Sequence, residues 1–175
     1  TLIDADGKLW SAGKRLDVPT NPRFTALLNG GVNDNEEDHR LGLDTNGQLW
    51  TWGNNGYGQL GNGTTARSNS PQPIPRSAFN GAAILAMSAS HYHNLVLDDQ
   101  NQLWAWGHVY DVTTLIPKPV DMTYFGNAKV TALASGFEHN LALDDQNRLW
   151  AWGVNNSNVL GNNIGRDYTE VPVLV

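Results

Sequence analysis

The chain has 175 residues, of which 40% are hydrophobic and 16% charged, and this composition is that of a folded protein and not of a disordered one. Its net charge of −6 argues against a basic nucleic-acid-binding surface, so no direct nucleic-acid partner is expected. Cysteine is absent, which excludes disulfides and cysteine-bound metals, and no apolar run approaches the roughly 18 residues of a membrane span. No signal peptide is recognisable, and the start at Thr1 instead of Met suggests a fragment or a processed product.

One short pattern occurs four times along the chain. It reads Asp-x-x-(Gly/Asn)-x-Leu-Trp-x-(Trp/Ala)-Gly and covers residues 4–13, 44–53, 98–107 and 144–153. The tryptophans of the four copies are spaced by 40, 54 and 46 residues: Trp10, Trp50, Trp104 and Trp150. Intervals of this length are typical of β-sheet repeats that bury their faces only by stacking on one another.

Each copy is predicted to form a β-hairpin. Apolar side chains alternate with smaller or polar ones before the turn, as in Leu41 and Leu43, and the Leu-Trp-x-Trp run alternates after it. Between the two strands lie Asn- and Gly-containing turns, which supply the positive φ angles that hairpins need. These turns are predicted at residues 45–47, 99–101 and 145–147.

Two further strands are predicted around each hairpin. Short apolar runs rich in small residues precede it at 24–28, 83–89 and 129–135, and they suit a crowded inner strand. Proline-containing segments follow it at 73–74, 117–120 and 172–173, and proline belongs on edge strands, where no ladder hydrogen bond is lost. The predicted unit is therefore a four-stranded antiparallel blade.

The predicted fold class is all-β: a β-propeller or partial propeller of about four blades of four antiparallel strands. We expect a single domain over residues 1–175, with repeats of approximately 1–23, 24–79, 80–126 and 127–175. The first repeat is expected to be incomplete, because no segment for an inner strand precedes its hairpin. The chain would then hold three complete blades and one without its innermost strand.

At this level of detail the pattern resembles the RCC1 (regulator of chromosome condensation) repeat. The fullest match is His39-x-Leu41-x-Leu43-Asp44, continuing to Leu49-Trp50-x-Trp52-Gly53 and the tail Gly58-Gln59-Leu60-Gly61. The family's Gly-x-x-His element is present at Gly136–His139, whereas Glu36 and Ser90 replace that glycine in two copies. The first and third copies lack the Gly-Gln-Leu-Gly tail. The resemblance implies an RCC1-like propeller, and the family's usual seven blades need about twice this length.

The repeated polar residues are interpreted as structural, and no enzyme activity, cofactor or metal site is expected. His39, His93 and His139 hold the same place in different blades, so they would not converge on one ion and are expected to hydrogen-bond backbone and tie inner loops together. The repeated aspartates are expected to accept N–H bonds in turns. Residues 56–61 have the spacing of a dinucleotide-binding loop, but no helix follows, so that reading is rejected.

Functional residues are instead expected where the copies differ. The two residues before each repeated histidine vary and are predicted to lie on loops at one face of the ring. The resemblance implies that acidic residues on such loops contact the small GTPase Ran in exchange-active relatives, and the polar extension 64–79 would be a long loop or a wedge-like protrusion. The candidate partner-binding residues are Glu37, Asp38, His91, Tyr92, Phe137 and Glu138.

The predicted function is a protein–protein interaction module with a protein partner, for which a Ran-type GTPase whose nucleotide exchange it promotes is one candidate. The mechanism would be non-covalent, with binding energy stabilising the nucleotide-free GTPase. The alternative is a non-catalytic scaffold or enzyme inhibitor, such as a secreted bacterial effector with a host target. The sequence leaves open whether the chain acts in its own cytoplasm or, as an effector, in a host cell.

Overall fold

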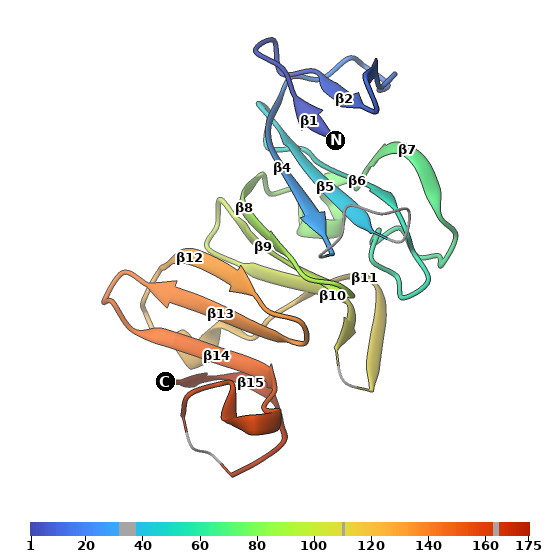
Figure 1. The fold of residues 1–175 in the computed structure, drawn as a ribbon. Coiled ribbons are helices and arrows are strands. Elements are labelled where there is room, and N and C mark those ends of the chain that lie inside the picture. Colours follow the sequence, from blue (N-terminus) through green and yellow to red (C-terminus); the bar gives the residue numbers. More distant parts are fainter. Residues whose placement is uncertain (32–37, 110, 163–164) are drawn as a thin grey trace.

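A computed structural model describes residues 1–31, 38–109, 111–162 and 165–175. The described chain forms four antiparallel sheets, three of four strands and one of three, which confirms the predicted all-β class. The sheets follow one another in chain order, and the two termini lie at opposite ends of the row (Figure 1). Each sheet is called a blade below, numbered from the N-terminus.

The first blade has three strands, β1 (Leu2–Ile3), β2 (Leu9–Ser11) and β3 (Lys14–Arg15). Its β1–β2 pair corresponds to the central hairpin of the other blades, with Leu2 opposite Trp10. Among the described residues this blade therefore has no inner strand.

The other three blades have four strands each, ordered from inner to outer as they occur in the sequence. The second blade contains β4 (Phe24–Gly30), β5 (His39–Asp44), β6 (Leu49–Gly53) and β7 (Ser68–Pro73). The third contains β8 (Ile84–Ala89), β9 (His93–Asp98), β10 (Leu103–Val109) and β11 (Val112–Pro119). The fourth contains β12 (Val130–Ser135), β13 (His139–Asp144), β14 (Leu149–Val154) and β15 (Tyr168–Leu174).

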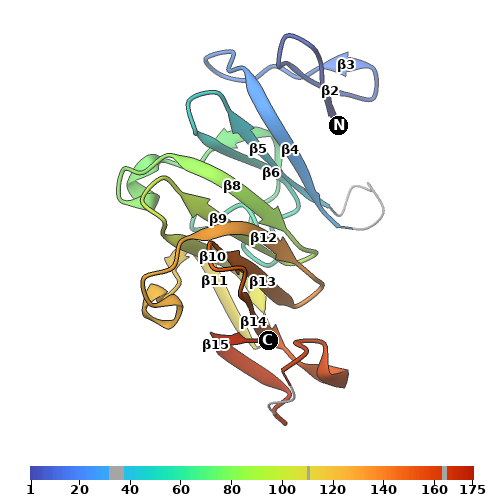
Figure 2. The same cartoon turned by 90° about the vertical axis from the view of Figure 1, so that its left-hand side faces the viewer.

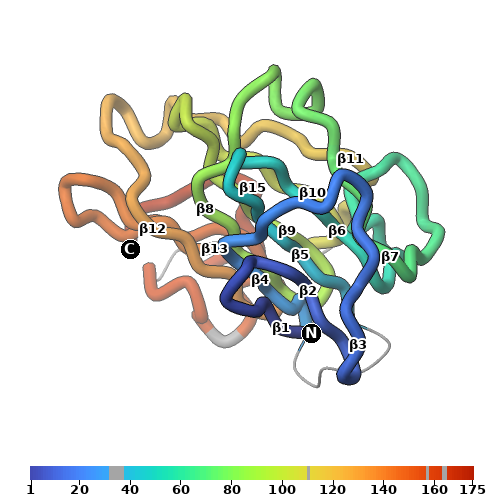
Figure 3. Tube along the Cα trace, turned by 90° about the horizontal axis from the view of Figure 1, so that it is seen from above, coloured from blue at the N-terminus to red at the C-terminus, as the bar shows by residue number. Residues whose placement is uncertain are grey.

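The blades stack face to face, and the inner strands β4, β8 and β12 succeed one another along the stack (Figure 2). Viewed along the stack, the blades overlap and the outer strands β7 and β11 lie away from β12 (Figure 3). The predicted edge strands carry prolines, as in Pro117 of β11 and Pro172 of β15. These positions agree with the rule that proline is tolerated where no further strand must pair.

The expectation of a long loop or wedge at residues 64–79 is largely wrong. Residues 68–73 form the outer strand β7, and Arg76–Phe79 form the 3₁₀ helix η1. Phe79 of this helix is buried to 1% exposure against Trp104 and Trp106 of the next blade. The segment is therefore part of the blade and of its packing. The third blade has an equivalent helix, η2 (Met122–Phe125).

Three hydrophobic clusters occupy the gaps between successive blades, and tryptophans fill much of each. The first gap holds Trp50 and Trp52, the second Trp104 and Trp106, and the third Trp150 and Trp152. All six indoles are at most 8% exposed, as expected for core residues. Because such rings bury large apolar areas, the contact between blades is the main source of stability in this fold.

The hairpin turns follow the predicted chemistry and add one bond that the sequence did not indicate. Asp44 Oδ1 accepts the main-chain N–H groups of Asn46 and Gln48 at 2.8 and 3.1 Å, and the turn glycine Gly47 has φ of 71°. Asp44 Oδ2 accepts the indole N–H of Trp50 at 3.1 Å. The same aspartate–indole bond joins Asp4 to Trp10, Asp98 to Trp104 and Asp144 to Trp150. Each aspartate thus fixes both its turn and the tryptophan six residues later.

Two of the three repeated histidines, His39 and His93, connect blades, and the expectation that they bond backbone is wrong. His39 Nε2 lies 2.7 Å from Asn94 Oδ1 of the third blade, and His93 Nε2 lies 2.9 Å from Asn140 Oδ1 of the fourth. An amide oxygen can only accept, so both Nε2 atoms carry hydrogen and donate. Each bond runs from one blade to the side chain that follows the histidine of the next blade.

Burial keeps these two histidines neutral. It lowers the pKa of His39 and of His93 to about 4, more than the bonds to Asn94 and Asn140 raise them. In the third blade Ser90 Oγ also lies 2.7 Å from His93 Nδ1, which accepts in this tautomer. Ser90 thereby takes the place of the motif glycine. In the second blade Gly30 packs directly against the His39 ring, and Glu36, expected at this position, lies outside the described residues.

Candidate protein-interaction surface

The predicted loop positions coincide in all three complete blades. The residue before each repeated histidine accepts a main-chain N–H from the residue just beyond the repeat glycine of the same blade. Asn54 donates to the carbonyl of Asp38 at 3.2 Å, His108 to that of Tyr92 at 2.9 Å, and Val154 to that of Glu138 at 2.9 Å. The same backbone hydrogen bond therefore holds Asp38, Tyr92 and Glu138 at equivalent positions of the three blades.

Of the acidic residues directly before His39, the structure describes Asp38 alone, and its carboxylate does not offer a charged contact surface. Glu37 lies outside the described residues. Asp38 is 2% exposed, and its carboxylate occupies the space above Gly31, which has no side chain. The carboxylate of Asp38, one of the predicted partner-binding residues, thus points inward against Gly31. Glu138 of the fourth blade is half-buried and remains accessible.

The other three candidates come together from two blades. The rings of His91 and Phe137 are stacked, with centroids 5.4 Å apart. Tyr92 meets Phe137 edge-on, also at 5.4 Å, and packs against His91 at 4.8 Å. Edge-on and offset contacts of this kind are the arrangements that aromatic rings prefer.

Two rings that the sequence analysis did not single out extend this cluster. Tyr57, in the connection after β6, lies 4.8 Å from Tyr92 and 5.2 Å from His108 of β10. His108 is also held by a 2.7 Å contact between its Nδ1 and Thr113 Oγ1. Both are positions where the copies differ, which is the one signal that could have found them. The five rings are called the aromatic patch: Tyr57, His91, Tyr92, His108 and Phe137.

The aromatic patch is on the surface, although its rings contact one another. Phe137 is 56% exposed and Tyr57 44%, while His91, Tyr92 and His108 are partly exposed. Aromatic side chains from three blades thus form a continuous apolar area with polar ring atoms. Tyrosine and other large rings on such areas are the usual anchors of protein–protein contacts.

Other kinds of site find little support in the part of the chain that the structure describes. Within it, no three His, Cys, Asp or Glu side chains gather where they could hold a metal ion. None of the described helices is long and apolar enough to cross a membrane. The aromatic patch is therefore the best-formed candidate surface for a partner.

Comparison with known sequences identifies the repeats. The description "Regulator of chromosome condensation (RCC1) repeat" matches residues 46–97 and, in a second form, residues 130–158. Protein RCC2 of Mus musculus is 39% identical over 69 residues, which cover 39% of this chain and 13% of that protein. Protein pim1 of Schizosaccharomyces pombe is 30% identical over 98 residues, covering 54% of this chain and 17% of pim1. This chain therefore matches only a small part of the length of these relatives.

Solved structures show the same architecture. Human WBSCR16 superposes with a TM-score of 0.81 over 99% of this chain and 49% of its own, at 21% identity. Prp20p of Saccharomyces cerevisiae superposes with a TM-score of 0.73 over 87% of this chain and 38% of its own, at 25% identity. The sheets described above are thus blades of the RCC1-type β-propeller. The chain thus contains repeats of the RCC1 type, folded as blades of an RCC1-type propeller.

Proposed function

We propose that this chain is a protein-interaction module that engages its partner through the aromatic patch, and that the partner is a small GTPase of the Ran type. The observation that carries the proposal is that the five exposed or partly exposed rings of the aromatic patch, contributed by three blades, contact one another. The scaffold positions are alike in the three complete blades, whereas these positions differ, which is expected where a repeat surface is adapted to one partner.

The kinship supports this partner class. The crystal structure of Prp20p was described together with its binding to Gsp1p and histones, and yeast RCC1 (Prp20) has been crystallised bound to Kap60. Protein partners are thus on record for structures that share this fold. Glu138, adjacent to Phe137 and half-buried, supplies a carboxylate beside the rings, which would pair with a basic residue at the rim of an interface.

The proposed mechanism is non-covalent. A surface that binds the nucleotide-free GTPase more tightly than the nucleotide-bound form shifts the equilibrium toward release, by no more than that difference in affinity. No side chain of this chain is assigned a bond-making role.

The test measures both binding and exchange. Binding of a Ran-type GTPase is followed by calorimetry, and exchange by release of a fluorescent nucleotide. The double variant Tyr92→Ala and Phe137→Ala is expected to weaken binding at least tenfold, because central aromatic anchors contribute about 2 kcal/mol or more each. Leu2→Ala and Leu174→Ala are controls, since these side chains, 59% and 52% exposed, match Phe137 at 56% and lie away from the patch.

The outcomes separate the parts of the proposal. Accelerated release that the double variant loses supports exchange through the patch. Patch-dependent binding without acceleration supports the scaffold alternative and removes exchange. Binding that the double variant leaves unchanged overturns the assignment of the patch.

A further inference from the structure

The second gap, between the second and third blades, is closed by a loop of the second blade. The main-chain carbonyl of Gln59 accepts two hydrogen bonds from the third blade, from Asn94 Nδ2 at 2.7 Å and from Trp106 Nε1 at 2.8 Å. Gly63 donates its N–H to the carbonyl of Leu115 in β11 at 2.9 Å. Residues 54–63 are called the closing loop.

In the third gap, between the third and fourth blades, the groups that bond the closing loop have equivalents on the fourth blade, but the third blade has no closing loop. Strand registers align Asn140 with Asn94, Trp152 with Trp106, and Glu170 with Leu115. The connection between the paired residues Gly53 and Ser68 is 14 residues long, whereas Gly107 and Thr114 are joined by six. In the third blade the strands simply continue outward, with Val109 paired to Val112.

Two donors that line the third gap are consequently left without the acceptor found in the second gap. Asn140 is 2% exposed and Trp152 5%. The amide oxygen of Asn140 is already used by His93 and Ser135, which fixes the amide nitrogen as the remaining group. Among the residues that the structure describes, neither Asn140 Nδ2 nor Trp152 Nε1 meets an acceptor. In the second gap the equivalent two groups bond one main-chain carbonyl, so the third gap presents a matching pair of donors to whatever enters it.

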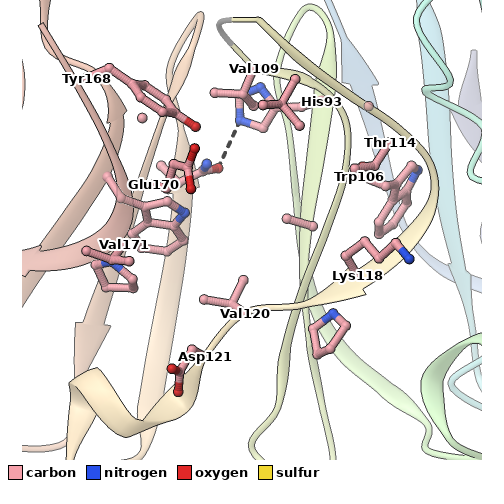
Figure 4. Close-up of a pocket in the computed structure, with 18 of the residues that line it drawn as sticks. His93, Trp106, Val109, Thr114, Lys118, Val120, Asp121, Tyr168, Glu170 and Val171 are labelled. Carbon is pink, nitrogen blue, oxygen red and sulfur yellow. Dashed lines mark hydrogen bonds between the residues drawn. The ribbon is translucent and has the colours of Figure 1, made fainter.

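A cleft of about 380 Å³ opens beside these donors, and both Asn140 and Trp152 line it. Figure 4 shows Tyr168, Glu170 and Val171 of the fourth blade facing Val109, Thr114 and Lys118 of the third across the open centre of the cleft. The outer strands β15 and β11 therefore form two facing walls, which carry both apolar and charged side chains. A volume of this size matches the lower range of binding sites.

The second gap, which is equivalent to this cleft, shows the kind of group that the donors bind. In the second gap the acceptor is a main-chain carbonyl in a turn, and Gly61 follows it at φ of 65°, packed so closely on Trp106 that no side chain fits. The main-chain carbonyl of Glu170 stands where that of Leu115 receives Gly63. A polypeptide segment with a glycine turn has a carbonyl to accept from Trp152 Nε1 and Asn140 Nδ2 and an N–H to donate to the Glu170 carbonyl. A small carbonyl compound has no such N–H group.

We propose that the cleft between the third and fourth blades is a receptor for a glycine-containing loop of a protein partner, whose main-chain carbonyl accepts from Trp152 Nε1 and Asn140 Nδ2. Glu170 replaces the apolar Leu115 in this wall, so the loop is neutral or basic rather than acidic. This site adjoins the aromatic patch, since Gly107 and Val109 on either side of His108 line the cleft, but it does not depend on the proposed GTPase partner.

The direct test uses the closing loop itself as the probe. A peptide of residues 54–63, acetylated and amidated, is titrated into the full chain while the tryptophan indole N–H signals are followed by NMR. We expect a saturable downfield shift of the Trp152 signal, identified with Trp152→Phe. The Trp106 signal stays in place, because its acceptor is already present. Trp152→Phe weakens binding about tenfold, the effect of one buried hydrogen bond.

A graft keeps the proposal falsifiable if the free peptide binds weakly. Residues 108–113 are replaced by residues 54–67, so that the third blade carries its own closing loop. The Trp152 indole is then expected to exchange with solvent as slowly as that of Trp106, and the added peptide no longer shifts it. A folded graft in which Trp152 still exchanges at the rate of the parent chain would overturn the proposal.

Discussion

The second and third gaps of this molecule are built from the same parts, yet only one is closed. Both have a histidine that bonds an asparagine across the gap, and both have an asparagine and a tryptophan that present N–H groups outward. In the second gap the Gln59 carbonyl receives those groups, whereas in the third they face a cleft. The comparison teaches that the repeated residues hold the blades together, while the connection after the second Trp decides what is left open.

The largest expected effect comes from truncating the two equivalent tryptophans. Trp106→Ala should lower the free energy of unfolding by about 4 kcal/mol, because it removes a buried ring and leaves the Gln59 carbonyl with one donor fewer. Trp152→Ala should cost about 1–2 kcal/mol less, because no hydrogen bond is lost and the cleft already adjoins the ring. Urea unfolding of both variants measures this difference, and equal losses would remove the distinction between the gaps.

Acid should weaken the feature that the two gaps share. His39 and His93 have folded-state pKa values of about 4, below the usual value of 6.5. The unfolded chain therefore binds more protons between these values, so stability is full above pH 6.5 and falls as the pH drops toward 4. The expected loss between pH 7.5 and pH 5 is about 2 kcal/mol for each histidine.

Denaturation at these two pH values checks this prediction. His93→Gln keeps an N–H group for Asn140 but does not titrate, so this variant should lose about half of the pH dependence. If His93→Gln retained the full pH dependence of the unfolding free energy, His39 and His93 would not be its source.

The smallest effect expected concerns two glycines that follow the Leu of the tail in different blades. Gly61 and Gly161 have φ angles of 65° and 70°, so alanine costs each about 1 kcal/mol in backbone strain. At Gly61 a side chain would also meet Trp106, whereas at Gly161 it would approach Val175. Thermal unfolding should therefore show Gly61→Ala to be the more harmful by about 1 kcal/mol. Equal melting temperatures would mean that the closing loop moves away at little cost.

Much of the fold could be predicted because its signals are local. Alternation with a period of two marks the strands, and Asp44 with Gly47 specifies a hairpin turn within four residues. The buried role of the tryptophans also follows from their recurrence at strand positions. These features depend on neighbours in the sequence, so a structure predicted for one copy of the repeat applies to the other copies.

The parts that could not be predicted depend on contacts between blades or on loop conformation. Asn94 and Asn140 are polar residues within predicted strands. Only the stacking of the blades shows that each accepts a hydrogen bond from the histidine of the preceding blade. Tyr57 joins the aromatic patch across a blade boundary. Asp38 is a charged residue at a variable position before the repeated histidine, yet its side chain is buried. The sequence located the variable loop positions, but contacts in space decide which of these side chains are exposed.

The claim that one gap is sealed and the other open is tested most directly by the indole hydrogens themselves. Hydrogen–deuterium exchange of the Trp106 and Trp152 N–H signals is measured in the full chain by NMR, with Trp106→Phe and Trp152→Phe for assignment. We predict that Trp106, bonded to Gln59, exchanges at least about 100-fold more slowly than Trp152, whose N–H faces the cleft. Similar rates for the two indoles would contradict the account.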